Sequence, residues 1–194
     1  MDGPRVKKLI WLVDTSLDGY MSGPNGELDW LGPDVDDEFW MHVNALLGTV
    51  DATLFGRATY QNFEQYWPAV PGNPASPTNE VEFSKWIERT PKQVASTTLS
   101  SLSWKNSILL DADIASSVSK MKEGKGKDVL MFGSCNLAAQ LFEANLIDEL
   151  QIRIHPIVLG VGRLAFRNGI MSHRLKLVHA KTFGSGVIGL RYEL

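Results

Sequence analysis

Apolar residues occur along this chain in two arrangements, short continuous runs and longer stretches with helical spacing. Lys8–Val13 and Asp128–Phe132 contain runs that are apolar without a break, as in parallel strands buried on both faces. Asp34–Leu47 instead carries Phe39 and Val43 on one stripe, with acidic residues in its first turn, which predicts an amphipathic helix. Strand and helix patterns thus follow one another along the chain.

Shorter segments continue this alternation. Further strands are predicted at Asp51–Phe55, Gln93–Ser96, Ser107–Leu110 and Asp148–Ile154. Further helices are predicted at Thr59–Tyr66, Glu80–Glu88, Ala112–Lys122 and Leu137–Glu143. Pro68–Thr78 contains four prolines and a glycine, and we predict that it is a surface loop.

The last part of the chain has a different pattern. Leu175–Phe183 and Val187–Tyr192 alternate around Gly184-Ser185-Gly186, which predicts a β-hairpin. Because strands that alternate with helices form sheets covered on both faces, we expect an α/β fold with a mostly parallel sheet and an antiparallel hairpin at its end. The length of 194 residues suits one domain spanning residues 1–194.

Composition narrows the class of protein. The net charge of −3, with no dense basic stretch to offset it, argues against a nucleic-acid partner. No apolar run approaches the roughly 20 residues that cross a membrane, and the start of the chain has no signal-peptide pattern. Cys135 is the single cysteine, which rules out an internal disulfide and fits a reducing compartment, so we expect a cytoplasmic protein.

Three strand ends carry small polar residues suited to phosphate. Gly133-Ser134-Cys135-Asn136-Leu137 joins a strand to a helix start, where backbone N–H groups and the helix dipole favour anions. Gly56-Arg57-Ala58-Thr59 offers a guanidinium fork and a hydroxyl that can cap the next helix. Ser96-Thr97-Thr98 ends another strand with three hydroxyls. Ligands of parallel sheets lie beyond the carboxyl ends of the strands, so these turns together predict a site for an extended dinucleotide.

Each of these turns also has a plainer interpretation. Arg57 can be a solvated arginine at a helix start, and Ser96–Thr98 can be an ordinary polar turn. No G-x-G-x-x-G follows the first strand, which disfavours a standard Rossmann dehydrogenase. Gly160-Val161-Gly162 is better explained as a loop that lets the backbone approach a neighbouring segment.

Candidate substrate residues lie in the loops after the first strand. Asp18 precedes Gly19, where it can stabilise an Asx-type turn, bind a nitrogen heterocycle or assist proton delivery. Trp30 can form an aromatic wall or pack in the core. His155 is better explained as a satisfied core histidine than as a pocket residue, and the other histidines lack metal-ligand spacing, so we expect no metal. Cys135 is better explained as a packed small residue than as a reactive thiol.

Six motifs, in order, make nearly the whole chain resemble the dihydrofolate-reductase-like superfamily, and within it the reductase domain at the C-terminus of the riboflavin-biosynthesis protein RibD and its stand-alone relatives. They are Ser16-Leu17-Asp18-Gly19-Tyr20, Gly26-Glu27-Leu28-Asp29-Trp30, Phe55-Gly56-Arg57-Ala58-Thr59-Tyr60, Phe132-Gly133-Ser134, Leu146-Ile147-Asp148-Glu149-Leu150, and the run from Pro156 to Phe166.

The resemblance implies a three-layer fold with a mixed sheet of about eight strands, and NADPH as the hydride donor. It implies that the cofactor is bound by residues at the three polar strand ends: Gly56, Arg57, Thr59, Ser96, Thr97, Thr98, Gly133, Ser134, Asn136 and Leu137. It places Asp18, Tyr20 and Trp30 on the substrate and nicotinamide side, with Asp18 as the candidate catalytic residue. A homodimer is expected, because relatives commonly dimerise and the terminal hairpin leaves an open sheet edge.

The chain departs from the superfamily in two places that bear on its substrate. Dihydrofolate reductases have a carboxylate in the first helix, whereas Trp40 stands near that place here. The riboflavin reductase binds a substrate phosphate through basic residues, for which Arg153, Arg163 and Arg167 are the candidates. We therefore expect a reductase of the 5-amino-6-(5-phosphoribosylamino)uracil type acting on a pyrimidine- or pteridine-like small molecule. A dihydrofolate reductase and a non-catalytic nucleotide-binding protein are the alternatives.

Overall fold

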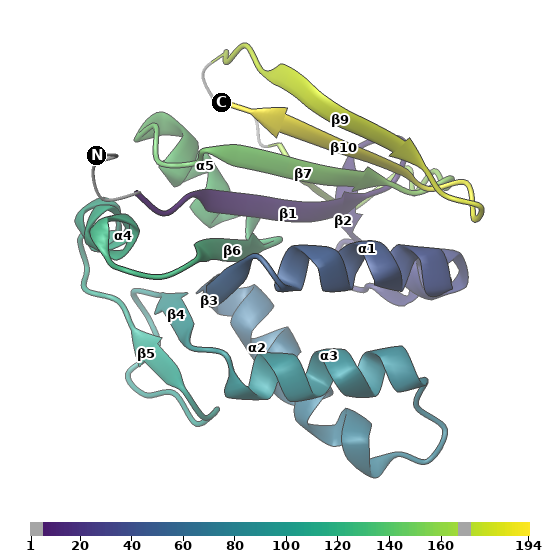
Figure 1. Cartoon of the computed structure of the whole chain (residues 1–194), viewed down its shortest axis with the longest axis horizontal. Helices are drawn as coiled ribbons and strands as arrows, with labels where there is room; N and C mark the ends of the chain where they lie inside the picture. Colours follow the sequence, from purple (N-terminus) through teal and green to yellow (C-terminus); the bar gives the residue numbers. More distant parts are fainter. Residues whose placement is uncertain (1–5, 167–171) are drawn as a thin grey trace.

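The computed structural model describes residues 6–166 and 172–194, and an eight-stranded sheet forms its centre (Figure 1). Its strands are β1 (Leu9–Thr15), β3 (Val50–Gly56), β4 (Lys92–Ala95), β5 (Ser107–Leu109), β6 (Asp128–Phe132), β7 (Glu149–Ile154), β9 (Lys176–Thr182) and β10 (Ile188–Glu193). Their order across the sheet is β5-β4-β3-β6-β1-β7-β10-β9. The pairs from β5 to β7 are parallel, whereas β10 is antiparallel to both of its neighbours. This confirms the predicted mostly parallel sheet and its C-terminal hairpin.

Helices cover both faces of the sheet. They are α1 (Asp37–Leu47), α2 (Arg57–Tyr66), α3 (Thr78–Arg89), α4 (Ile114–Glu123) and α5 (Cys135–Glu143), with the 3-10 helices η1 (Asp29–Asp34) and η2 (Trp67–Gly72). Figure 1 shows α1 and α3 in front of the sheet and α5 behind β7 and β1. Among the helices of the described part of the chain, none has the length and apolar character needed to span a membrane.

The unbroken apolar run of β1 is explained by the two cores that it separates. Ile10 and Leu12 point into the core beneath α1, α2 and α3, whereas Leu9, Trp11 and Val13 point into the core beneath α4 and α5. Successive strand residues face opposite sides, so a strand covered on both faces must be apolar at every position. The three-layer α/β arrangement expected from the sequence is therefore confirmed.

A second, two-stranded sheet lies beyond the carboxyl end of β1. It pairs β2 (Tyr20–Ser22) with β8 (Arg163–Leu164). A Cβ atom on Gly162 would lie 2.2 Å from the carbonyl oxygen of Ser22, so only glycine fits at this position. This confirms the predicted close backbone approach of the glycine-containing loop, although neither short strand was predicted.

One prediction of local structure was wrong, and one predicted helix begins two residues earlier than expected. The expected loop Pro68–Thr78 includes most of η2, because Val70 is buried and the Ser84 hydroxyl donates to the Trp67 carbonyl at 2.7 Å. The helix expected from Thr59 begins instead at Arg57, with Gly56 as its N-cap. Proline fits the first turn of a helix, so a proline-rich segment that buries an apolar residue can be helical.

Candidate functional site

The three polar strand ends meet at one edge of the sheet. β4, β3 and β6 are parallel neighbours, so their carboxyl ends lie side by side. Gly56 pairs with Ala95, the residue before Ser96, and its N–H donates to the Ser134 hydroxyl at 2.9 Å. Segments far apart in the sequence therefore form one continuous polar rim, as the sequence predicted.

The turn between β6 and α5 is built from two consecutive left-handed residues. Gly133 has a φ of 47° and Ser134 a φ of 57°, and the second is unusual for a residue with a side chain. The Gly133 N–H donates to the Leu12 carbonyl at 2.9 Å, and its own carbonyl accepts the Trp11 indole N–H at 2.5 Å. The left-handed conformation of Ser134, which has a side chain, alone costs about 1–3 kcal/mol, a cost often found at functional sites.

This turn directs the start of α5 toward the rim. The first amides of the helix, from Cys135 to Leu137, have no acceptor inside the helix and carry the positive end of its dipole. Asn136 is exposed there, whereas Leu137 is buried in the core beneath α5. Of the predicted residues on this turn, Leu137 can therefore offer a ligand only its backbone.

Arg57 occupies the first position of α2 and is exposed. No carboxylate of residues 6–166 or 172–194 forms an ion pair with it. The predicted capping role of Thr59 was wrong, since no side chain caps α2 and the Thr59 hydroxyl accepts from Ser134 at 3.0 Å. Thr59 and Ser134 thus fix the two turns against each other, next to an arginine without an acidic partner.

Ser96 largely stabilises its own turn. Its hydroxyl oxygen accepts from the Thr98 N–H at 3.2 Å and the Leu99 N–H at 3.0 Å. Thr97 and Thr98 are exposed beside it. The Ser96 hydroxyl therefore stabilises the turn, and Thr97 and Thr98 are exposed at the rim, while the cofactor role of all three residues stays a prediction.

Asp18 connects two loops. Its carboxylate accepts from the Ser16 hydroxyl at 2.6 Å, from the Leu159 N–H at 3.1 Å and from the Gly160 N–H at 2.8 Å. The Ser16 bond and these backbone bonds lower the pKa of Asp18, so it remains ionised near neutral pH. These are the contacts of a residue that positions a loop, and its predicted role in proton delivery stays a prediction.

Trp30 lies beside an open cleft at the same edge. The cleft has a volume of about 420 Å³ and is lined by Gly23, Pro24, Glu27, Asp29, Trp30, Leu159 and Val161. The indole of Trp30 is buried and packs edge-on against the His155 ring at 5.3 Å, yet its N–H has no hydrogen-bond partner among the described residues. Tyr20, on β2, is half-buried beside Gly162. Trp30 therefore offers an unused donor next to this cleft.

A buried ionic cluster supports this edge, and sequence reasoning missed it. Asp14 accepts from Arg153 Nε at 2.7 Å and Nη2 at 2.5 Å, and contacts His155 Nε2 at 3.0 Å. Burial alone would raise the pKa of Asp14, but Arg153 and His155 outweigh it and lower the pKa. His155 is thus the satisfied core histidine that we expected. The signal was Asp14 at the end of an apolar strand, a charge that needed a buried partner.

The arginine candidates for a substrate phosphate fall in different places. Arg153 is committed to Asp14, which leaves it little capacity for a ligand at this edge. Arg163 is exposed on β8. Arg167 lies outside the described residues. At the position where dihydrofolate reductases have a carboxylate, Trp40 packs against Phe83 at 5.9 Å.

The rim suits a phosphorylated ligand better than a metal ion. An exposed arginine without an acidic partner lies next to a glycine turn and a helix N-terminus, which are the donors that phosphates use. In the described part of the chain, no group of three histidine, cysteine or acidic side chains is placed to hold a metal ion.

Comparison with known proteins agrees with this geometry. The family model of the RibD C-terminal domain matches residues 7–189. The uncharacterized protein YyaP of Bacillus subtilis (strain 168) is 32% identical over 187 residues, which cover 96% of this chain and 95% of that protein. A second uncharacterized protein of the same strain, YwjB, is 24% identical over 181 residues, covering 93% of this chain and 95% of that protein.

Solved structures share the fold. A putative riboflavin biosynthesis protein from Shewanella sp. PV-4 superimposes with a TM-score of 0.73 and 23% identity, covering 96% of this chain and 98% of the other. The deaminase/5-amino-6-(5-phosphoribosylamino)uracil reductase of Thermotoga maritima gives a TM-score of 0.65 and 15% identity, and the match covers 97% of this chain but 56% of that one. Together with the family match and the relative YyaP, these findings confirm the resemblance: the chain belongs to the RibD C-terminal domain family.

Proposed function

We propose that this protein is an NADPH-dependent reductase of the riboflavin-biosynthesis type, acting on a pyrimidine- or pteridine-like small molecule. The observation that carries the proposal is the meeting of the β3, β4 and β6 ends in one polar rim, where Arg57 forms no ion pair with a described residue. A reductase domain family and a solved deaminase/reductase of the same fold support it.

The rim would hold the phosphates and adenosine ribose of the cofactor. Arg57 would bind phosphate oxygens through its guanidinium fork, and the first amides of α5 would donate to a second phosphate. At the border of the rim, ribose hydroxyls or phosphate oxygens would be contacted by Thr97, Thr98 and Asn136. Bound NADPH supplies the hydride, and the protein contributes orientation and exclusion of water.

The loops after β1 would hold the acceptor molecule. Asp18 would fix the turn against Leu159 and Gly160, which border the cleft beside Trp30. The unpartnered indole N–H of Trp30 would donate to a carbonyl or ring nitrogen of the heterocycle, because a buried donor without a partner is costly. A heterocycle with an acceptor at its edge satisfies that requirement.

Turnover tests the reductase assignment. Purified protein is mixed with NADPH and 5-amino-6-(5-phosphoribosylamino)uracil, and the loss of the reduced-nicotinamide absorbance is followed, with dihydrofolate in a parallel reaction. We expect oxidation with the pyrimidine. Oxidation with dihydrofolate alone would instead indicate a dihydrofolate reductase. NADPH binding without oxidation across a panel of heterocycles would indicate a nucleotide-binding protein.

Arg57→Gln tests the cofactor site separately from turnover. The variant should bind NADPH about tenfold more weakly, the loss expected when one charge-assisted hydrogen bond is removed. Arg89→Gln is the matched control, because Arg89 is also exposed and lies on α3, away from the rim. Equal affinity of parent and Arg57→Gln, measured by calorimetry, would show that Arg57 does not bind the cofactor.

We also propose that the protein forms a homodimer through its C-terminal hairpin. β9 is a sheet edge exposed along almost its whole length, and Leu177 and Ile188 are 51% and 39% exposed. Exposed apolar sheet edges are normally covered by pairing. Sedimentation equilibrium should therefore report a dimer that Leu177→Glu dissociates, and a parent protein that remains monomeric at micromolar concentration would contradict this.

A further inference from the structure

A second cleft lies on the face of the sheet covered by α1, apart from the polar rim. It has a volume of about 340 Å³ and extends from Lys8, Asp128 and Glu149 at the amino ends of the parallel strands to His42, Arg153, His179 and Arg191. The rim turns are at the opposite, carboxyl ends of those strands. This cleft is not explained by the proposed function.

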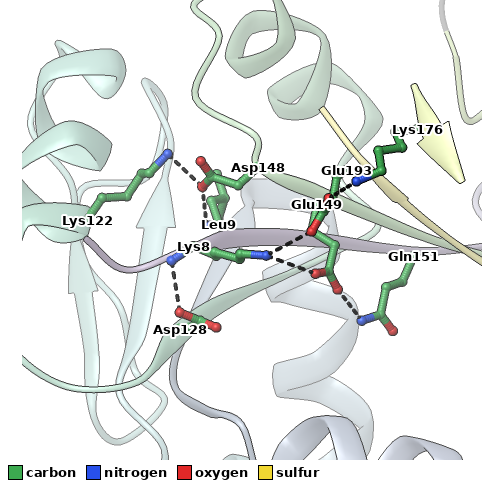
Figure 2. Close-up of polar contacts among 9 residues, drawn as sticks. All are labelled: Lys8, Leu9, Lys122, Asp128, Asp148, Glu149, Gln151, Lys176 and Glu193. Carbon is green, nitrogen blue, oxygen red and sulfur yellow. Dashed lines mark hydrogen bonds and ion pairs between the residues drawn. The ribbon is translucent and has the colours of Figure 1, made fainter. Parts of the chain in front are cut away.

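The acidic groups at the amino end of this cleft are already paired, as Figure 2 shows. Lys8 Nζ lies 3.7 Å from Glu149 and 3.6 Å from Glu193, and Lys176 Nζ lies 3.5 Å from Glu193. Gln151 donates to Glu149 at 2.7 Å, and the Asp128 carboxylate accepts from the Lys8 N–H at 2.9 Å. No carboxylate at this end therefore needs a cationic ligand.

Two cations near the middle of the cleft are paired as well. Arg153 binds Asp14, and Lys181 Nζ lies 3.1 Å from Glu38 on α1. What remains is a group of basic side chains that form no ion pair with another described residue: Arg191 on β10, His179 on β9 and His42 on α1. Within the described residues, no ion pair involves any of these three.

These three groups come together at one cleft. Arg191 and His179 are directly opposite each other on the antiparallel pair, so their side chains lie on the same face of the sheet. His42 faces them from α1 and packs edge-on against Phe183 at 5.5 Å. Burial, followed by the charges of Arg153, Lys181, His179 and Arg191, lowers the pKa of His42. Three side chains that can donate hydrogen bonds to an anion therefore line one cleft, and the guanidinium of Arg191 carries a permanent positive charge.

We propose that this cleft binds the oxyanion group, phosphate or carboxylate, of a small molecule between Arg191, His179 and His42. The planar guanidinium of Arg191 can bind two oxygens of such a group, and each protonated imidazole can donate one further bond. The volume of about 340 Å³ leaves room for a metabolite-sized body along the polar floor formed by Gln151.

Histidine titration by NMR tests the site directly. The Hε1 resonance of His42 is followed against pH in a buffer without oxyanions, then with inorganic phosphate and, in a separate arm, with citrate. A bound anion stabilises the protonated imidazole, so the pKa of His42 should rise with ligand. His173, which packs against Phe142 on the other face of the sheet, should not respond. The same titration of His42 with and without both anions would overturn the proposal.

Variants separate this cleft from the rim. Arg191→Gln should weaken phosphate binding about tenfold, and His179→Gln should weaken it measurably less at neutral pH. The response of the His42 resonance reports this binding, because His42 lines the cleft. The exposed control Arg89→Gln should leave that response unchanged. A His42 response to phosphate that Arg191→Gln leaves intact would overturn the proposal. Because the readout is anion binding, failure of the reductase assay would leave this result interpretable.

Discussion

Asp14 shows how a single charged residue organises the edge of the sheet. It lies near the end of an otherwise apolar strand, and its charge is tolerated because Arg153 lies opposite it on the neighbouring strand β7 and His155 directly follows that strand. The sequence analysis missed this cluster, because the partners of Asp14 are 139 and 141 residues away along the chain. Pairings of this kind depend on tertiary register and are not visible from local spacing.

Replacing Asp14 with asparagine should lower the free energy of unfolding by about 3 kcal/mol, because it leaves the Arg153 charge buried without its partner. Urea denaturation followed by fluorescence measures the effect. Glu82→Gln is the control, since it removes an exposed ion pair with Lys85 and should cost at most about 0.5 kcal/mol. Equal losses in the two variants would mean that the cluster contributes no more than a surface pair.

The difference in unfolding free energy between the parent and Asp14→Asn should change with pH in one direction only. The pKa of Asp14 is lowered in the folded protein from its usual 3.8, so its contribution is present above that pH and is lost as the pH falls through the folded value. The gap in stability between parent and Asp14→Asn should therefore be constant from pH 5 to 7, as Asp14 is fully ionised there, and should narrow below pH 3.8. A gap that widens on acidification would contradict this assignment.

The long strands and helices lie close to the positions predicted from the sequence, whereas the shortest elements were not predicted. β2 and β8 contain three and two residues, too few for any periodic pattern, and were missed. η2 was not predicted, because a segment rich in proline is more often a loop than a helix. The predicted approach of the Gly160–Gly162 loop to a neighbour was confirmed, since a pair of glycines indicates crowding even where the partner, Ser22, is unknown.

Gly162→Ala should destabilise the β2–β8 pair, because its Cβ atom would lie 2.2 Å from a backbone oxygen that cannot move without breaking the pair. We expect a loss of about 2 kcal/mol in unfolding free energy and faster amide exchange in Tyr20–Ser22. Gly160→Ala is the control in the same loop: its φ of +72° also strains a residue with a side chain, but no atom lies within 4 Å of the added Cβ atom. Equal effects in both variants would show that backbone strain, not the contact, decides.

The topology of the whole sheet is what makes the proposed site predictable. Because β4, β3, β6 and β1 are parallel neighbours, polar turns that follow them in sequence must converge at one edge. The turns, together with the predicted parallel sheet, were therefore enough to predict the rim. It could not predict the cleft around Arg191, since that surface depends on the register of an antiparallel hairpin against α1.

The same topology keeps the two anion-binding surfaces apart. The rim lies at the carboxyl ends of the parallel strands, and the second cleft extends to their amino ends on the α1 face. Leu177 and Ile188 belong to the hairpin face opposite His179 and Arg191, as the strand register requires. A dimer formed on that apolar face would therefore leave the basic cleft open.

Amide chemical shifts recorded during an NADPH titration test the central claim most directly. If the cofactor lies across the ends of β3, β4 and β6, the largest shifts should fall on Gly56, Arg57, Thr97 and the start of α5 from Cys135 to Leu137. The amides of β9 should stay in place. Shifts concentrated around Arg191 and His179, or spread evenly over the molecule, would contradict the account.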